Sequence, residues 1–563
     1  MNRAERRRQA KLQESRSPTR VPAQLASLLQ EAVSFHRTGR LQEAEQLYRQ
    51  ILSSHPRHAE TLHMLGLLAY QASKLDMAAD LLSKAVAEDS SNARYFFNLG
   101  VVRQKQGHAE SAAEAYRKAL GLDPNYLDAQ GNLGNLLLEQ GRLDEAATCH
   151  QTVLGLNPRS AEAHNNLGVV LKEQGRLDEA VASYRRALDL KPDHLEALCN
   201  LGSALMDQDR LDEAVASFQR AISLRPDYVK AHSNLGFAYL WQQRPDAALA
   251  SFRKAADLRH NHGRPVALSA IHKSRIKHEV EQLQRLLDRR LIAPGYEPYL
   301  DAWKRLRQLT LQLPPDSLYL SVSRDDVPDL SPSFNRILYY ADCPPLPGGA
   351  LNQALDVAAI EARYNAQKPE VTYIDDLLRP EALESLRRFC MDSTIWKKDY
   401  VNGYVGAFLA EGFSCPLFLQ LAEELRARLP GIFKGHRLMQ AWSFKCDSQM
   451  KALNLHADAA AVNVNFWITP DEANLDQEHG GLIVWDKEAP KEWNFKDYNS
   501  SKNEPKVRAF LRDSGAKAIT IPYRQNRAIV FNSDLFHESQ PFRFKDDYES
   551  RRVNITLLYG RRK

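Results

Sequence analysis

The stretch GRLDEAVASYRRALDLKPD, residues 175–193, decides the fold of the first half of the chain. Its pattern returns every 34 residues, most visibly in a Leu-Gly pair that starts at positions 65, 99, 133, 167, 201 and 235. Alanine keeps the same register at 44, 78, 112, 146, 180, 214 and 248, and proline at 56, 124, 158, 192 and 226. A period of this length predicts an array of similar supersecondary units that stack on one another.

The spacing within each unit predicts a helix, a tight turn and a second helix. Glycine and alanine at fixed points let two helices approach closely, and proline ends each unit because it cannot continue a helix. A large aromatic residue often lies four positions after the alanine that recurs every 34 residues, and we expect it to fill the gap between helix pairs. These aromatic residues are Tyr48, Tyr116, Tyr184, Phe218 and Phe252. The pattern resembles the tetratricopeptide repeat, and we count seven units between about residues 25 and 262.

An asparagine directly precedes five of the Leu-Gly pairs. Equal positions of stacked repeats line up along one surface, so these carboxamides would form a row. One interpretation is helix-terminal or inter-repeat hydrogen bonding, and the other is that the row binds the backbone of an extended peptide. The array is similar to that of the O-linked N-acetylglucosamine transferases, in which an asparagine ladder holds the substrate polypeptide, but no glycosyltransferase domain is recognisable after it. The candidate peptide-binding residues are Asn98, Asn132, Asn166, Asn200 and Asn234.

Hydrophobic runs, charge and cysteine spacing limit the classes of protein to which the chain can belong. No run approaches the roughly 18 apolar residues of a membrane span, so we expect a soluble protein with no membrane contact. Residues 1–24 form a basic tail, which we expect to be disordered. Its charge is the only feature that supports a nucleic-acid contact, so we expect nucleic acid to be an unlikely partner. The six cysteines show no CxxC spacing, which fits a reducing cytoplasm.

Beyond the repeats we predict two further regions. Residues 263–365 lose the 34-residue register but keep helical patterning at 272–292 and 299–313, which predicts capping helices followed by a linker. Residues 366–563 predict an α+β domain, with a short strand near 371, helices from Pro380 and over 416–429, and six β segments. These segments span 440–447, 461–469, 480–486, 516–523, 527–533 and 551–560, and they predict an antiparallel sandwich or barrel.

The β segments carry candidate metal ligands. His456 and Asp458 lie in LNLHADAAAVNVNFWITP, residues 453–470, and His537 follows 79 residues later. Two imidazole nitrogens and one carboxylate oxygen can occupy one face of an ion and leave three positions open, the arrangement that suits non-haem Fe(II) oxygenases. The alternative is that all three are ordinary polar residues at loop edges, since an HxD pair is expected by chance in a chain with 17 histidines.

The last strand adds a candidate anchor for a carboxylate. Arg552 shares one face of the strand with Asn554 and Thr556 by period-two alternation, whereas Arg551 lies on the opposite face. An arginine near a metal would pair bidentately with a carboxylate. HxD, a distal histidine and this R-x-N together resemble the Fe(II)- and 2-oxoglutarate-dependent oxygenases, particularly their prolyl-hydroxylase-like branch, over residues 370–563.

The resemblance implies a double-stranded β-helix, or jelly-roll, core. It implies His456, Asp458 and His537 as iron ligands and Arg552, with Asn554, as the cosubstrate anchor. Asn465 either lines the pocket with them or faces solvent. The implied cofactors are Fe(II), 2-oxoglutarate as cosubstrate and O2, with ascorbate as a candidate reductant. Two features depart from the family: the strand before HxD lacks the usual tyrosine, and the spacing from His537 to Arg552 is long.

We therefore expect a multidomain cytoplasmic protein in which an α-solenoid precedes a dioxygenase domain. The main hypothesis is a hydroxylase that acts on a protein or peptide captured by the repeats. The alternative is an interaction scaffold whose oxygenase-like domain is inactive. We also expect the segment over 487–516, which is long for a connection between strands, to act as a mobile lid.

Overall fold

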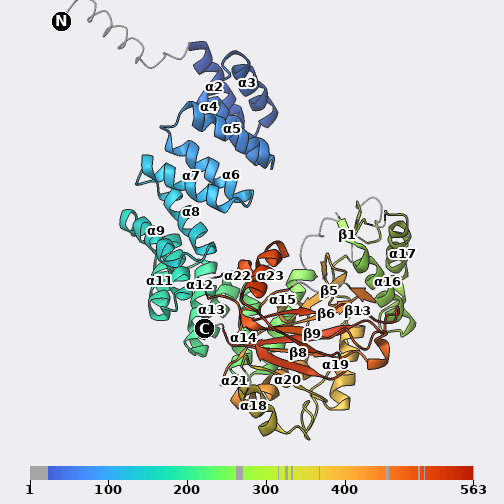
Figure 1. Cartoon of the computed structure of the whole chain (residues 1–563). Coiled ribbons are helices and arrows are strands. Elements are labelled where there is room, and N and C mark those ends of the chain that lie inside the picture. The colour runs from blue at the N-terminus through green and yellow to red at the C-terminus, as the bar shows by residue number, and fades with distance from the viewer. Residues whose placement is uncertain are drawn as a thin grey trace, which may run out of the picture. The chain divides into compact units, whose positions relative to one another are not determined.

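The chain divides into two compact units, one reaching Pro192 and the other beginning at Asp193 (Figure 1). The computed structural model describes residues 23–261, 270–314, 316–323, 328–330, 334–366, 368–450, 455–491, 493, 495–499 and 501–561. The predicted basic tail therefore lies, up to residue 22, outside the described residues. Among the described helices, none is long and apolar enough to cross a membrane.

The seven predicted repeats correspond to seven helix pairs in the described chain. The first unit holds five of them, α2 Ala23–Arg37 with α3 Leu41–Ser54, α4 Ala59–Gln71 with α5 Leu75–Glu88, α6 Ala93–Lys105 with α7 Ala109–Leu122, α8 Leu127–Glu139 with α9 Leu143–Leu156, and α10 Ala161–Glu173 with α11 Leu177–Leu190. The second unit holds the other two, α12 Leu195–Asp207 with α13 Leu211–Leu224 and α14 Val229–Trp241 with α15 Pro245–His260.

Close approach of the paired helices explains the glycine of each Leu-Gly pair. A Cβ atom on Gly168 of α10 would lie 2.6 Å from the ring of Tyr184 on α11, and one on Gly202 of α12 would lie 2.5 Å from the ring of Phe218 on α13. Both rings are fully buried. The aromatic residue thus occupies the space that a larger side chain would need, which is why the two positions recur together.

The last two repeats share a hydrophobic core with the C-terminal region. Leu240 and Phe252 belong to the same buried cluster as Leu419 and Val464, and the indole Nε1 of Trp241 donates to the carbonyl of Leu438 at 2.9 Å. The compact unit thus begins at residue 193, within the repeats, whereas the sequence suggested separate regions divided near residue 262. The repeat register marks similar units, but packing decides where a compact unit begins.

The helices predicted at 272–292 and 299–313 are α16 Lys273–Asp288 and α17 Glu297–Leu311. They form a hydrophobic cluster of their own, which contains Ile276, Leu283, Leu300 and Trp303. Helix α15 packs on the short helix η2 Leu409–Glu411 and on α20 Pro416–Arg428, while α16 packs on α17 and on α19 Pro380–Asp392. The cover over the last repeat therefore includes α20, which sequence reasoning had not placed there.

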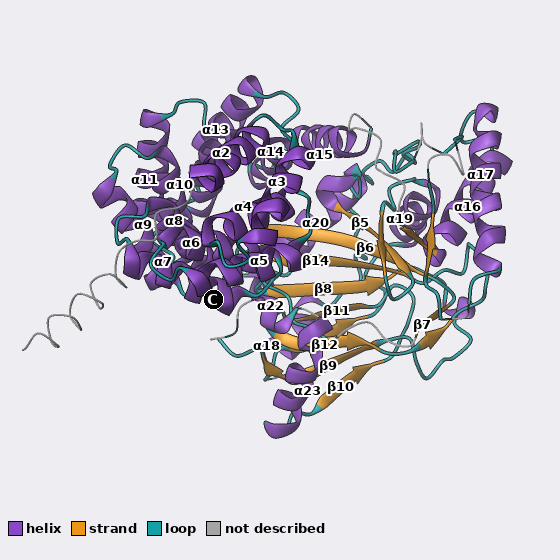
Figure 2. Ribbon diagram, turned by 90° about the horizontal axis from the view of Figure 1, so that it is seen from above, coloured by secondary structure: helices purple, strands orange, loops and turns teal. Residues whose placement is uncertain are grey.

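The C-terminal region contains two antiparallel sheets with a hydrophobic cluster between them. A seven-stranded sheet has the order β3-β11-β8-β14-β6-β5-β4, and a three-stranded sheet has the order β10-β9-β12 (Figure 2). The strands are β3 Val371–Ile374, β4 Lys398–Tyr400, β5 Tyr404–Phe408, β6 Leu438–Cys446, β8 Val462–Trp467, β9 Leu482–Glu488, β10 Ala518–Ile521, β11 Ala528–Asn532, β12 Leu535–Ser539 and β14 Val553–Tyr559.

Smaller elements complete this region. Two short antiparallel pairs join β1 Ala270–His272 to β2 Tyr319–Ser321, and β7 Gln449–Met450 to β13 Phe542–Arg543. The remaining helices are the 3-10 turns η1 Pro294–Tyr296, η3 Asp471–Ala473 and η4 Ser501–Asn503, with α18 Val357–Ala366, α21 Pro430–Phe433, α22 Phe495–Tyr498 and α23 Glu504–Asp513. All six predicted β segments contain strands, whereas β4, β5 and β12 were missed because they are short and do not alternate clearly.

Alternation along β8 assigns its two faces to different surroundings. Val464 and Phe466 join the core that the helices cover, while Trp467 joins the cluster between the sheets with Val484 of β9 and Phe531 of β11. The asparagines of β8 share the second face with Trp467. We call this surface, between the two sheets, the inner face of the seven-stranded sheet.

Candidate metal centre

Two strand-like segments that are distant in sequence bring the candidate ligands together. His456 pairs with His537 of β12 in an isolated antiparallel bridge. The His456 N–H donates to the His537 carbonyl at 3.1 Å, and the His537 N–H donates to the His456 carbonyl at 2.8 Å. The Asp458 N–H donates to the carbonyl of Ser533 at 3.1 Å, so backbone bonds hold all three positions.

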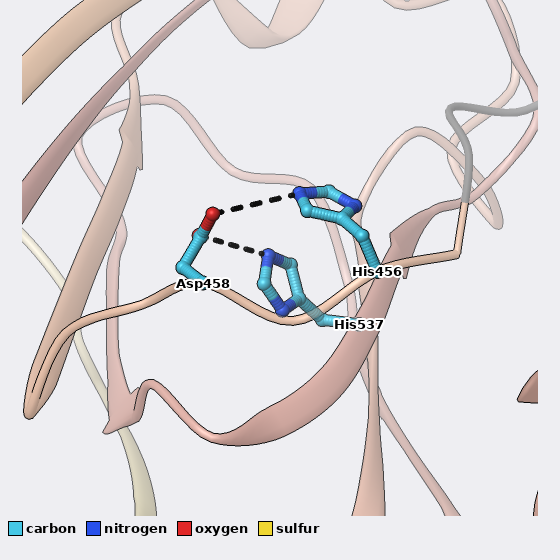
Figure 3. A group of neighbouring side chains, drawn as sticks. All are labelled: His456, Asp458 and His537. Carbon is cyan, nitrogen blue, oxygen red and sulfur yellow. Dashed lines mark ion pairs between the residues drawn. The ribbon is translucent and has the colours of Figure 1, made fainter. Parts of the chain in front are cut away.

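The three side chains converge on one point (Figure 3). One ligand atom from each of His456, Asp458 and His537 lies within 4.8 Å of the others. The Nε2 atoms of His456 and His537 lie 3.9 and 3.4 Å from the two oxygens of Asp458. An octahedral ion with ligands at about 2.1 Å separates neighbouring donors by about 3 Å, which the distances of 3.9 and 3.4 Å exceed by about 0.9 and 0.4 Å. Of the described residues, only this group has metal-ligand composition and spacing.

Hydrogen bonds fix the chemical form of two ligands. Nδ1 of His537 lies 3.1 Å from the carbonyl of Leu535, which can only accept, so Nδ1 carries a proton and Nε2 is the nitrogen that faces Asp458 and would bind an ion. Burial raises the pKa of the Asp458 carboxyl, but the hydrogen bond from His537, the charges of both imidazoles and the amide of Asn463 outweigh it and hold this pKa below its ordinary value. The aspartate is thus held as a carboxylate.

Exposure differs among the three ligands. The side chains of Asp458 and His537 are 6% and 5% exposed, whereas that of His456 is 29% exposed. The ring of His537 also packs edge-on against Phe531, with centroids 5.0 Å apart. The open side of the centre is therefore the His456 side.

The two arginines of the last strand face different surroundings. Arg551 forms an ion pair with Glu281 of α16 and approaches Asp447 at 3.6 Å. Arg552 is 1% exposed and donates from Nε to the carbonyl of Gly480 at 3.1 Å, while its buried Nη1 has no hydrogen-bond partner in the described part of the chain. Burial lowers the pKa of its guanidinium below the ordinary value.

The inner face around Arg552 carries further buried polar groups. The guanidinium carbon of Arg552 lies 5.6 Å from the ring of Trp467, whose Nε1 is buried and has no hydrogen-bond partner among the described residues. The Oδ1 atom of Asn554 is likewise buried without a described partner. Asn465 is buried and donates to Oγ1 of Thr556 at 3.0 Å, so it points inward rather than to solvent. Buried donors and acceptors without protein partners are available to bind a ligand or water.

Two residues near the centre were not assigned from the sequence. Asn463 is fully buried and donates from Nδ2 to Oδ2 of Asp458 at 2.7 Å; its alternation with Val462 and Val464 was the available signal. Tyr404 of β5 stands opposite Cys446 in the register and packs against the cluster between the sheets. It therefore places a phenol on the strand next to β6, and it was missed because β5 was not predicted.

The asparagine row divides between the two units and is half-buried throughout. In the first unit, Asn98 bonds Nε2 of His63 at 2.7 Å and Asn166 accepts from Asn165 at 3.2 Å. In the second unit, Asn200 accepts from Lys230 at 3.2 Å. Part of the row thus takes part in bonds within the array, as the structural interpretation expects, while the partial exposure leaves the peptide-binding interpretation open.

Comparison with known proteins identifies the repeats. The tetratricopeptide repeat family matches residues 29–93, 97–149 and 132–194, and a second tetratricopeptide repeat description matches residues 202–243. No curated protein matches the chain. Among solved structures, a MamA protein is 26% identical over 29% of this chain and 96% of its own, with a TM-score of 0.27. YrrB, described as a TPR protein with an unusual peptide-binding site, is 26% identical over 33% of this chain and 95% of its own, with a TM-score of 0.28.

A tetratricopeptide repeat protein from Parabacteroides merdae covers more of the chain. It is 19% identical over 42% of this chain and 94% of its own, with a TM-score of 0.37. The family matches and the seven helix pairs agree in register with the sequence period. The chain thus carries an N-terminal array of tetratricopeptide repeats, followed by a β-rich C-terminal region.

Proposed function

We propose that the protein is an Fe(II)- and 2-oxoglutarate-dependent hydroxylase, with a double-stranded β-helix core, that acts in the cytoplasm on a protein or peptide bound by the repeats. The observation that carries this proposal is the convergence of His456, Asp458 and His537 within 4.8 Å. Three such donors on one face leave room at the ion for a bidentate cosubstrate and O2.

The residues present fit the iron. The donor set has two imidazoles and one carboxylate, which matches the facial set of non-haem Fe(II) oxygenases. Bound Fe(II) would supply the oxidative decarboxylation of 2-oxoglutarate by O2, which is coupled to hydroxylation of a C–H bond and releases succinate and CO2. The protein's own contribution is to hold the ligands: the Leu535 carbonyl fixes the tautomer of His537, and Asn463 holds one oxygen of Asp458.

The inner face fits the cosubstrate. Arg552 Nη1 and Trp467 Nε1 are both buried donors without described partners, and their groups are 5.6 Å apart from guanidinium carbon to ring centroid. A carboxylate with two acceptor oxygens satisfies both, and the Arg552 contact would be charge-assisted. Asn554 and Thr556 extend the same polar surface along β14, where burial excludes water from the cosubstrate.

The repeats support a polypeptide substrate. Tetratricopeptide arrays present an extended surface to partners, and the half-buried asparagines offer paired donors and acceptors to a peptide backbone. A peptide that binds the repeats is held by the same chain as the metal centre, so binding by the repeats adds to the affinity for the substrate. This binding thus compensates for a weak affinity at the metal centre itself.

Fe(II)-dependent conversion of 2-oxoglutarate to succinate tests the proposal. We expect turnover by the wild-type chain, stimulated by substrate peptide, and none by His456→Ala. Absence of turnover with every peptide tried, together with absence of metal binding, would reject the enzyme. Peptide affinity of the full chain should fall in Asn166→Ala if the row binds substrate, and stay unchanged if the row is structural.

A scaffold with an inactive C-terminal region is the second candidate. The observation that favours it is that the family matches lie between residues 29 and 243, within the repeats. In that case the wild-type chain binds its peptide partner with the same affinity as His456→Ala, and neither variant consumes 2-oxoglutarate.

A further inference from the structure

The connection between β9 and β10 packs behind the candidate metal centre. We call residues 489–516 the insert; it contains α22, η4 and α23. The sequence suggested a mobile lid over the substrate, and the described residues of the insert instead build a hydrophobic cluster with the segments that carry the ligands. This cluster contains Leu455, Ala457 and Phe536 from those segments, with Ala489, Tyr498, Val507 and Leu511 from the insert.

Period-two alternation explains why the insert meets these residues. In both segments the ligands point to one side, and their chain neighbours point to the other. Leu455 and Ala457 flank His456 and are buried in the cluster, and Phe536 directly precedes His537 and is fully buried there. The insert therefore covers the face of the ligand-bearing segments that lies opposite to the ligands.

Polar contacts tie the insert to the residue between the two HxD ligands. The Ala457 N–H donates to the Tyr498 carbonyl at 3.3 Å, and Nδ2 of Asn499 donates to the Ala457 carbonyl at 3.0 Å. Both backbone polar groups of Ala457 are thus bonded to the insert. Since His456 and Asp458 flank this residue, its position sets where both ligands leave the backbone.

A second contact ties the insert to the strand of the distal histidine. Nη2 of Arg508, on α23, lies 2.8 Å from Oε2 of Glu538, and Nη1 lies 3.4 Å from Oε1. Glu538 follows His537 directly and is 7% exposed. The hydrogen bond to Glu538, and a further one to Glu504, raise the pKa of the Arg508 guanidinium above its ordinary value. The ion pair is held on the outer side of β12.

We infer that the insert is a positioning element, in which Asn499 and Arg508 hold the two ligand-bearing segments at the separation that the metal requires. This inference rests on the proposed metal centre but concerns residues that touch neither metal nor substrate. Removal of groups that bond directly to metal ligands typically lowers metal affinity by about 10- to 100-fold. Asn499 and Arg508 bond residues next to the ligands, so we expect losses at the lower end of that range. The insert would thus act on metal affinity more than on global stability.

Cobalt(II) binding to the full chain tests the inference without any need for turnover. We expect Asn499→Ala and Arg508→Met each to weaken Co(II) affinity about tenfold and to broaden the Co(II) visible absorption bands. Arg508→Lys, which keeps a cation for Glu538, should recover most of the affinity. Arg512→Ala is the matched control, because Arg512 is exposed on the same helix. Circular dichroism verifies that each variant remains folded.

The outcomes separate the two proposals. Unchanged Co(II) affinity in both folded variants, beside tight binding by the wild type, overturns the positioning role and leaves the metal centre intact. Absence of Co(II) binding by the wild type overturns the centre and the positioning role together. Metal binding with the expected losses, but without consumption of 2-oxoglutarate, supports the positioning role and rejects the proposed hydroxylase.

Discussion

His456 and His537 face each other across an antiparallel bridge, with their ring centroids 4.4 Å apart and their planes inclined by 50°. The two residues are 81 positions apart in sequence, and two backbone hydrogen bonds join them directly. This bridge brings the imidazoles to one side of the carboxylate of Asp458, which is the geometric basis of the candidate metal centre.

Removing any of the three ligands should abolish metal binding. We expect His456→Ala, Asp458→Ala and His537→Ala to lower Co(II) affinity by more than about 100-fold. This loss is larger than the one expected for Asn499→Ala or Arg508→Met. The control is His194→Ala, because His194, at the N-terminal cap of α12, has the same one-residue spacing from Glu196, and no third ligand lies beside this pair among the described residues. Isothermal titration calorimetry measures the affinities, and equal losses in the control variant would contradict the assignment.

Substitution of the two adjacent arginines should have different effects, one on cosubstrate binding and the other on the stability of the fold. Arg552→Met removes the buried cation whose Nη1 has no partner among the described residues, and it should raise the KM for 2-oxoglutarate roughly 30-fold or more, as expected when a buried charge pair is broken. Arg551→Met should instead lower the free energy of unfolding by about 3–5 kcal/mol, because it leaves Glu281 without its buried partner. Steady-state kinetics measure the KM, and urea unfolding measures the free energy of unfolding. A raised KM in Arg551→Met, with a destabilised Arg552→Met, would show that Arg551 binds the cosubstrate and Arg552 is structural.

Two glycines of the repeats should respond oppositely to alanine. Gly168→Ala places a methyl group 2.6 Å from the Tyr184 ring and should destabilise the protein by about 1–3 kcal/mol through overpacking. Gly131, in α8, has open space around its Cβ position, so Gly131→Ala should stabilise its helix by up to about 1 kcal/mol. Thermal unfolding followed by circular dichroism measures both; a loss of stability in Gly131→Ala would argue against the packing described for α8.

Acidification should weaken the first repeats through His63. Burial, reinforced by the nearby charge of Arg94, lowers the pKa of His63 to about 4. The unfolded chain therefore takes up a proton between about pH 6.5 and 4 while the folded chain does not, so stability is full above about pH 6.5 and falls as the pH drops through this window.

His63→Gln tests this effect because glutamine does not titrate and offers an oxygen to Asn98. Its melting temperature should depend less on pH between 6.5 and 4 than that of the wild type. His108→Gln, at an exposed position, serves as the control and should keep the wild-type dependence. Equal pH profiles for His63→Gln and wild type would show that His63 does not carry the effect.

Much of the fold could be predicted because its signals are local. The 34-residue period requires only helix propensity and small residues at fixed points, so the helix pairs followed directly from positions such as Gly168 and Tyr184. The candidate ligands could be named because a distal histidine and the R-x-N of the last strand accompany the HxD pair, which by itself is expected by chance. Strand β12 was missed, although it carries His537, because it spans only Leu535–Ser539 and its apolar and polar residues do not alternate.

The sequence by itself determined the repeat register, the β-rich end of the chain and the identity of the candidate ligands. Only the tertiary structure decided that the last two repeats share a core with the C-terminal region, that Asn463 bonds Asp458, and that the insert packs behind the ligands. These relationships join residues that are far apart along the chain or face one another across strands. Local patterns show which face of an element is apolar, but packing between elements selects the partner of that face.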